Sequence, residues 1–341
     1  MSSLRIDVVD PLDEDTLAGW HAVYAASRRH RDPETAMIFT LPELRVELLH
    51  PGPRHWNAGY VGTVDGTPVV SGFIDTPLLD NLTLAEIRID TLPEHRGRGY
   101  GAAMLAHLEQ VARERDRSVL TTMATWGFEA GQDGADSPEV GFLTEQGFSL
   151  SLVDIQHWLT LPLPEGRLEA LAAEAAQHHP SYTLRSWVGP VPEELVGGWV
   201  ELESTLMTEA PMGDLAWEAE LADVSVRREA EAQLVRQGRT PYSTVALDAA
   251  GEVVAYTEVV ATTHEPGKAY QWGTLVRPAD RGHRLGLAVK VANVALIQRE
   301  RPDLTQVVTW NAEVNAHMVR VNEQLGFRPV ERLGEFQKRL G

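Results

Sequence analysis

Two short stretches of the chain combine Arg and Gly in a way that suits the binding of an anion. The first is Arg96, Gly97, Arg98, Gly99, Tyr100 and Gly101, and the second, 185 residues later, is Arg281, Gly282, His283, Arg284, Leu285 and Gly286. Glycine lets the backbone approach a ligand without a Cβ clash. The first amides of a following helix are unpaired and carry the positive end of its dipole. Each stretch therefore predicts a cradle for a phosphate or a pyrophosphate.

The first stretch also matches the dinucleotide-binding pattern G-x-G-x-x-G/A through Gly97, Gly99 and Ala102. That pattern requires an acidic residue about 20 positions later, and residues 119–126 contain none. A P-loop is excluded because no Gly-Lys-Ser/Thr follows. A plain glycine-rich turn with solvated Arg side chains stays open. Its recurrence, each time with a Pro three residues before the first Arg (Pro93 and Pro278), argues against that interpretation.

The flanking residues predict the same order of elements in both halves, β-α-α-β-β-β-α-β-α-β-β. In the first half the strands are expected at 59–64, 68–75, 84–90, 119–126 and 153–161, with Asp65-Gly66 as a hairpin turn and a helix over 102–115. In the second half they are expected at 244–247, 252–262, 269–276, 306–310 and 336–340, with a helix over 287–299. A short helix closed by Gly-Phe precedes each last strand region, at Gly147-Phe148 and Gly326-Phe327.

Prolines mark the boundary between the halves. Pro162 and Pro164 interrupt regular structure, residues 165–178 are rich in Ala and Glu, and Pro180 ends that helical pattern. We therefore expect an N-terminal domain at 1–162, a linker helix within 163–180 and a C-terminal domain at 181–341.

Composition narrows the class of function. The chain has 341 residues, 43% apolar and 23% charged, with a formal net charge of −19. Such acidity opposes nucleic-acid binding and favours cationic small molecules, or simply aids solubility. The absence of Cys excludes disulfides and thiolate metal ligands, and no metal site is expected. Residues 1–5 do not resemble a signal peptide, and no apolar run reaches the roughly 20 residues of a membrane span. We expect a cytoplasmic monomer or homodimer without a membrane partner.

The repeated turn and its context resemble the GNAT superfamily of acetyl-coenzyme A-dependent N-acetyltransferases, present in tandem. The pyrophosphate motif of that family, Gln/Arg-x-x-Gly-x-Gly/Ala, is matched by Arg96, Gly99 and Gly101. The resemblance implies an α+β fold with two GNAT-like domains. Each would be a mostly antiparallel mixed sheet whose fourth and fifth strands splay apart, with helices on both faces.

The resemblance also implies the residues that bind acetyl-coenzyme A. The backbone of the fourth strand would pair with the pantetheine arm at Ile89 and Thr91 in the first half, and at Thr274 and Val276 in the second. The pyrophosphate would lie on the two Arg/Gly turns. An Asn after the fifth strand would contact the arm, with Asn315 as the first candidate and Asn311 as the second. Asn315 also suits a helix N-cap before Ala316.

The halves depart from the family pattern in different ways. Arg284 stands where the first half has Gly99. Its amide could still bind phosphate if φ is negative, as at a helix start; otherwise the second site is weakened. The first half replaces the Asn segment with the acidic, glycine-containing loop 127–138.

The candidate catalytic residues are less certain than the turn. Many family members carry a Tyr six residues before the Phe of Gly-Phe, but this chain has Phe142 and Val321 there. Asn322 is the neighbouring candidate, and Tyr270 or Tyr256 could supply the proton instead. A general base is needed because amines are protonated at neutral pH. Glu86 fits in the first half; its counterpart at equal spacing, Gln271, cannot titrate, so Glu258 and His264 are the candidates in the second. For each of these residues, a solvated strand position without a catalytic role is the alternative that the sequence favours.

The leading hypothesis is therefore acetyl transfer from acetyl-coenzyme A to a primary amine of a small molecule. One half would catalyse, preferably the second, and the other would be structural or regulatory. A non-catalytic acyl-coenzyme A-binding or sensing protein and a protein lysine acetyltransferase are the alternatives.

Overall fold

The computed structural model describes residues 3–341, and the chain forms two compact units. Unit 1 contains the chain up to Val153 together with Gly213–Ala216 and Arg332–Gly341. Unit 2 contains Asp154–Met212 and Trp217–Glu331. Each unit has its own layered core of helices on a mixed sheet, so each is described by itself.

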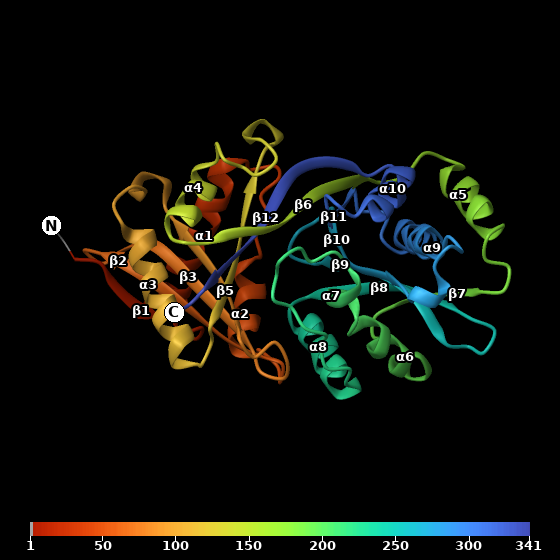
Figure 1. Cartoon of the computed structure of the whole chain (residues 1–341), viewed down its shortest axis with the longest axis horizontal. Coiled ribbons are helices and arrows are strands. Elements are labelled where there is room, and N and C mark those ends of the chain that lie inside the picture. The colour runs from red at the N-terminus through yellow and green to blue at the C-terminus, as the bar shows by residue number, and fades with distance from the viewer. Residues whose placement is uncertain (1–2) are drawn as a thin grey trace. The chain divides into compact units, whose positions relative to one another are not determined.

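The sheet of unit 1 is antiparallel except at one pair of strands (Figure 1). Its order is β1 (Arg5–Val8), β2 (His55–Val64), β3 (Thr67–Pro77), β4 (Leu84–Thr91), β5 (Val119–Trp126) and β12 (Arg328–Arg339), with β4 and β5 parallel. The predicted hairpin between β2 and β3 turns at Asp65 and Gly66, whose φ angles of 50° and 80° suit a type I′ turn.

Helices cover both faces of this sheet. α1 (Glu14–Arg31) and α2 (Leu41–Leu49) pack on one face, where the Trp20 indole donates a hydrogen bond of 2.9 Å to the Gly72 carbonyl. α3 (Tyr100–Glu114) and α4 (Pro138–Glu145) enclose the larger core on the other face. A Cβ on Gly72 would lie 2.5 Å from the sulfur of Met104, so this glycine lets α3 approach the sheet closely.

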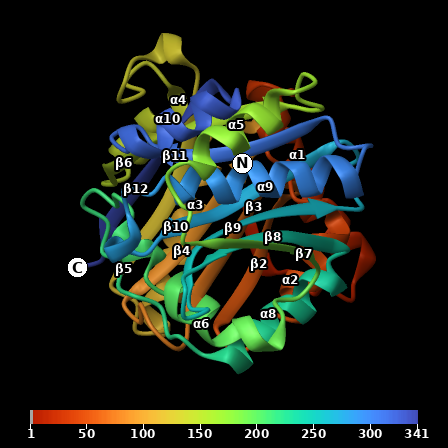
Figure 2. The ribbon, with the colours of Figure 1, turned by 90° about the vertical axis from the view of Figure 1, so that its right-hand side faces the viewer.

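Unit 2 repeats the plan, as Figure 2 shows with α5 and α9 above β8 and β9, and α6 and α8 below them. Its sheet runs in the order β6 (Ser149–Thr160), β11 (Gln306–Ala312), β10 (Lys268–Val276), β9 (Val253–Thr262), β8 (Arg239–Leu247) and β7 (Thr183–Val188). Its helices are α5 (Arg167–Ala176), α6 (Glu193–Glu203), α7 (Leu206–Glu209), α8 (Val224–Arg236), α9 (Leu285–Glu300) and α10 (Ala316–Leu325).

The last strand of each half pairs in the sheet of the other half. The two strands expected after each Gly-Phe form one long strand each, β6 and β12. β12 pairs with β5 from Arg332↔Trp126 to Arg339↔Val119, and β6 pairs with β11 from Asp154↔Ala312 to Thr160↔Gln306. Phe336 of β12 is 1% exposed within the core of unit 1. Each sheet is therefore completed by a segment distant in sequence.

The fold class predicted from the sequence is confirmed: both units are mixed, mostly antiparallel sheets with helices on both faces. Helix α5 lies within the segment 163–180 and buries Leu171 and Ala175 in the core that contains α9. The boundaries 1–162 and 181–341 stay a prediction about independent domains. Among residues 3–341, no helix is long and apolar enough to span a bilayer.

Candidate functional site

The Arg/Gly turn of unit 1 is open to a ligand. The short helix η1 (Pro93–His95) leads through Arg96 into α3, with Gly97 at φ 72° and Gly99 at φ 83°. A Cβ at either glycine would meet no atom within 4 Å. The free amides at the start of α3 therefore border open space, which fits a phosphate group.

The arginines of this turn are held by neighbouring groups. Arg96 donates to the Ser27 hydroxyl at 3.2 Å and forms an ion pair of 3.4 Å with Glu139, while Arg98 donates to the Glu94 carbonyl at 3.1 Å. These contacts fix Arg96 beside the turn and leave Arg98 bound only through a neutral carbonyl oxygen.

Unit 2 forms the same turn, but the left-handed position that Gly99 occupies in unit 1 is taken by Arg284. η3 (Pro278–Asp280) leads into α9, Gly282 has φ 89°, and Arg284 has φ 54° and ψ 22°. The negative φ that was the stated condition for phosphate binding by the Arg284 amide is therefore not met. Like Gly99, Arg284 is a left-handed N-cap, so the backbone of the cradle is retained. An L-residue in this region carries strain of about 1–2 kcal/mol.

Carboxylates neutralise the side chains of the second turn. Arg281 pairs with Glu209 at 2.8 Å, Arg284 pairs with Glu174 of α5, and His283 contacts the His178 carbonyl at 3.2 Å. Anion binding at this turn therefore depends mainly on backbone amides, whereas the first turn adds arginine charge.

Both sheets splay where the family resemblance predicted. β4 and β5 pair only from Leu84↔Val119 to Glu86↔Thr121, and β10 and β11 only from Lys268↔Gln306 to Tyr270↔Val308. Beyond these pairs lie the predicted arm-binding positions: Ile89, Thr91, Thr274 and Val276. The Thr274 hydroxyl contacts that of Thr257 at 2.7 Å.

A β-bulge distinguishes the two splays. β4 pairs with β3 without interruption, but the register of β10 against β9 shifts between Gln271 and Thr274. Trp272 and Gly273 together lie opposite Glu258. The extra residue also changes which residues of the two halves correspond to each other. Glu86 is in the last pair between β4 and β5, and Tyr270 is in the last pair between β10 and β11, so these two residues correspond. The match of Glu86 to Gln271, which assumed equal spacing, is therefore corrected. Bulges often lie beside active sites because they redirect side chains.

A carboxylate network lies beside the bulge on the face covered by α6 and α8. Arg227 contacts Glu258 at 2.7 Å, Glu203 at 2.8 Å and Glu231 at 3.3 Å. Glu258 is 3% exposed and also accepts from the Ser243 hydroxyl at 3.1 Å. Burial, with the nearby Glu258 and Glu220 charges, raises the pKa of Glu203 to about 7, against the opposing effect of Arg227.

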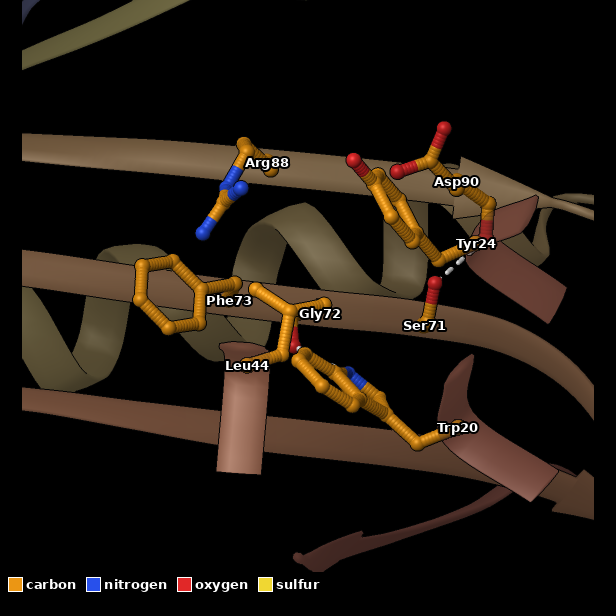
Figure 3. A pocket seen from close by; sticks show the side chains of 8 residues that line it. All are labelled: Trp20, Tyr24, Leu44, Ser71, Gly72, Phe73, Arg88 and Asp90. Carbon is orange, nitrogen blue, oxygen red and sulfur yellow. Dashed lines mark hydrogen bonds between the residues drawn. The ribbon is translucent and has the colours of Figure 1, made fainter. Parts of the chain in front are cut away.

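The corresponding face of unit 1 contains Arg28 and Arg88, each paired with a carboxylate, and Figure 3 shows Arg88 and Asp90 in its pocket. Its small pocket is lined by Trp20, Tyr24, Leu44, Ser71, Gly72, Phe73, Arg88 and Asp90. The Arg88 guanidinium stacks 4.1 Å from the Phe73 ring centre, and Arg28 pairs with Asp90 at 3.0 Å. Burial raises the pKa of the half-buried Glu86, an effect that Arg88 opposes.

A second polar network lies on the α9 face of unit 2. Lys290 is 2% exposed and donates to the side-chain oxygens of Asn322, at 2.9 Å, and Gln271, at 3.4 Å. Asn322 in turn donates to the side-chain oxygen of Asn311. The structure thus brings together two residues predicted for different roles, Asn322 and Asn311, through a lysine that was not predicted.

The remaining candidates lie elsewhere. Asn315 caps α10 by accepting from the Met318 amide at 3.1 Å, as its N-cap interpretation predicted. His264 is exposed beyond the end of β9, six residues after Glu258, and is not brought to the bulge. Tyr270 bonds to Glu265 and stacks on Trp310, whereas the buried Tyr256 lies against Gly273.

Sequence reasoning missed Glu203, Arg227 and Lys290. Only Lys290 had a usable signal: it lies in a helix that is apolar on almost every side, so a polar residue there must be buried. No group of His, Asp and Glu among residues 3–341 could hold a metal ion.

Comparisons with known proteins agree with this geometry. Residues 14–147 match the model of the acetyltransferase (GNAT) family. Residues 14–147 therefore carry a GNAT acetyltransferase domain, which supports acyl transfer as the activity, and the tandem layout expected from the sequence agrees with a solved tandem GNAT protein.

Solved structures extend the likeness over the whole chain. A tandem GNAT protein from the clavulanic acid biosynthesis pathway is 26% identical, with 99% of both chains covered and a TM-score of 0.78. A GCN5-related N-acetyltransferase from Sphaerobacter thermophilus shares the fold at 15% identity, covering 99% of this chain and 96% of that one, with a TM-score of 0.65. No curated protein matches the sequence significantly.

Proposed function

We propose that the protein is an acetyl-coenzyme A-dependent N-acetyltransferase that acts by direct transfer to a primary amine of a small molecule. Catalysis is assigned to unit 2, and a structural or regulatory role to unit 1. The observation that carries the assignment is the bulge of β10. It follows the last β10–β11 pair directly and lies beside the network of Glu258, Arg227 and Glu203.

The residues of unit 2 fit the cofactor that GNAT enzymes generally use. The bound cofactor would supply the acetyl group as a thioester. The amides of residues 282–286 would hold its pyrophosphate, and the backbone of Thr274 and Val276 its pantetheine arm. A Cβ on Gly286 would meet only the Val276 side chain, at 3.7 Å, so the helix start has room for a ligand.

Glu203 is the best-placed general base. Its side chain is 31% exposed, and its pKa of about 7 makes it half ionised at neutral pH, where a base is most effective. Glu258 is buried and held by Arg227 and Ser243, so it supplies fixed negative charge. Together these carboxylates attract a protonated amine and then accept its proton at Glu203.

Unit 1 is less suited to an amine. Arg88 lies over Phe73 on the face that carries the carboxylates in unit 2, and β4 has no bulge. The Arg88 charge, offset in part by Glu47 at 3.6 Å, disfavours an ammonium group here. Its turn, with open glycines and Arg98, favours a role in cofactor binding without transfer.

The test is thiol release from acetyl-coenzyme A over a panel of small amines, with variants at matched glycines. We expect Gly286→Glu to lower turnover by about 100-fold or more, because its carboxylate repels the pyrophosphate. Gly286→Gln controls for size without charge, and Gly101→Glu should leave turnover close to that of the wild type.

Three outcomes would contradict the proposal. Loss of turnover in Gly101→Glu alone would move catalysis to unit 1. Tight cofactor binding with no release by any amine would indicate an acyl-coenzyme A sensor. Release only with lysine-bearing proteins would indicate a protein acetyltransferase.

A further inference from the structure

Lys290 is a buried ammonium group without a direct part in the proposed transfer. It lies in the second turn of α9, 2% exposed, with the Phe327 ring centre 5.2 Å from Nζ. Its hydrogen-bond acceptors within residues 3–341 are two neutral amide oxygens, those of Asn322 and Gln271. Burying a charge without a carboxylate partner is costly, so a packed apolar side chain would make a more stable core.

An ammonium group can only donate hydrogen bonds, and this decides how the two amides point. While Lys290 is protonated, both must turn their oxygens toward it and their NH₂ groups away from it. The reversed orientation would place NH₂ donors against the ammonium. Two chains of hydrogen bonds therefore begin at Lys290, one through Asn322 and the other through Gln271.

One chain ends in the splay. Asn322 directs its NH₂ to the Asn311 oxygen, which leaves the NH₂ of Asn311 as the free donor. Asn311 lies three residues beyond Val308, the last residue of β11 that pairs with β10. The donor is thus presented where β10 and β11 have separated.

The other chain ends at the bulge. Gln271 directs its NH₂ to the carbonyl of Glu258 at 2.6 Å, the Thr257 hydroxyl at 3.0 Å and the carbonyl of Gly273 at 3.3 Å. These carbonyls lie where the ladder between β9 and β10 is interrupted. The amide of Gln271 therefore stabilises the bulge that distinguishes unit 2 from unit 1.

We propose that Lys290 is a positioning residue: through Asn322 and Gln271 it orients the Asn311 amide toward the cofactor arm and holds the β10 bulge in place. The inference rests on the proposed function of unit 2. It adds a residue that touches neither cofactor nor acceptor.

The first experiment needs no cofactor. Hydrogen exchange of the Asn322 side-chain NH₂ is measured by NMR in the wild type and in Lys290→Met. We expect slow exchange in the wild type and exchange at least about 10-fold faster in the variant, because the amide loses the donor that orients it. Lys268→Met, at a partly exposed lysine of the same unit, is the matched control and should show no change.

The second experiment measures the affinity for coenzyme A by calorimetry in the Gly101→Glu background, so that only unit 2 reports. We expect Lys290→Met and Asn311→Ala each to weaken binding by about 5- to 10-fold, the effect of one hydrogen bond. The double variant should be no weaker than either single one. Asn322→Asp, which keeps an acceptor for Lys290 but removes the donor to Asn311, should reproduce the loss if Lys290→Met folds poorly.

Additive losses in the double variant, or unchanged Asn322 exchange in Lys290→Met, would overturn the inference and leave Lys290 a structural residue. The affinity of Gly286→Glu for coenzyme A tests the proposed function separately. If Gly286→Glu in the same background leaves coenzyme A affinity unchanged, unit 2 is not the binding unit, and the exchange experiment alone then decides the orienting role of Lys290.

Discussion

The protonation of Lys290 gives the sharpest physical prediction, because the chain contains only three lysines: Lys268, Lys290 and Lys338. Burial lowers the pKa of Lys290 from 10.5 to about 7. Each pKa unit corresponds to about 1.4 kcal/mol, so the folded state loses roughly 5 kcal/mol relative to one with an ordinary lysine at low pH. Substitution by Met should remove this cost.

The sign of the pH dependence follows from proton binding. Below pH 7 the folded and unfolded states both hold the proton, and the full cost is present. As the pH rises toward 10.5 the folded state loses its proton first, so the free energy of unfolding should increase, by roughly 2 kcal/mol between about pH 7 and pH 9. Lys290→Met should be more stable than the wild type at pH 7 and nearly independent of pH over this range.

Other titratable groups with shifted pKa values change the free energy of unfolding little between pH 7 and pH 9. The raised pKa values of Asp154 and Glu203, about 6 and 7, lower stability with increasing pH only below this range. His157, which faces Lys290 from β6, has its pKa lowered by burial and is already neutral. Tyr256 has its pKa raised well above 10 and ionises later.

Two measurements test the prediction. Lysine labelled with ¹³C at Cε should give three resonances, and the one lost in Lys290→Met should titrate near pH 7. Urea unfolding at pH 7, 8 and 9 should give diverging stabilities for the wild type and the variant. The absence of a resonance that titrates near pH 7, or stabilities of the wild type and the variant that change in parallel with pH, would refute the reasoning.

Further predictions concern the turn, the base and the exchanged strand. Because Arg284 is left-handed, Arg284→Gly should be more stable than Arg284→Ala by about 1 kcal/mol in urea unfolding; equal stabilities would argue against the strain. Glu203→Gln should lower kcat/KM by about 100-fold and remove its acidic limb near pH 7, and a retained limb would exclude Glu203 as the base. A chain that ends at residue 327 should lose the native circular dichroism and cooperative melting of unit 1, and a peptide of residues 328–341 should restore both; a cooperative melt without the peptide would show that β12 is dispensable.

Local sequence patterns were sufficient for the glycine turns and for most of the element order, although the two strands expected at the end of each half form one strand. Gly97, Gly99 and Gly282 adopt positive φ where the pattern requires it, and Asp65-Gly66 forms the expected hairpin. These features depend on residues close in the chain, so composition and spacing report them directly.

Features that depend on distant pairing could not be read from the sequence. The bulge at Trp272 and Gly273 arises from register against β9, and its extra residue defeats a comparison of the halves by equal spacing. The exchange of β6 and β12 depends on which sheet edge each strand joins. Arg227, Glu203 and Glu258 lie on three separate elements, α8, α6 and β9. The sequence around each residue gives no sign that the three are in contact.

The two units differ in the charge of the face where an acceptor amine would bind. This difference favours catalysis in unit 2 over catalysis in unit 1. In unit 2, Glu203, Glu231 and Glu258 surround Arg227, so the face beside the bulge keeps an excess of negative charge even after Arg228 pairs with Glu231 at 2.8 Å. In unit 1 the same face carries Arg88, which pairs with Glu47 at 3.6 Å. Two like charges 4 Å apart repel by about 4 kcal/mol at an effective dielectric constant near 20. Because Glu47 offsets part of the Arg88 charge, the repulsion in unit 1 is smaller than this, but unit 1 still lacks the excess of negative charge that attracts a protonated amine to the bulge of unit 2.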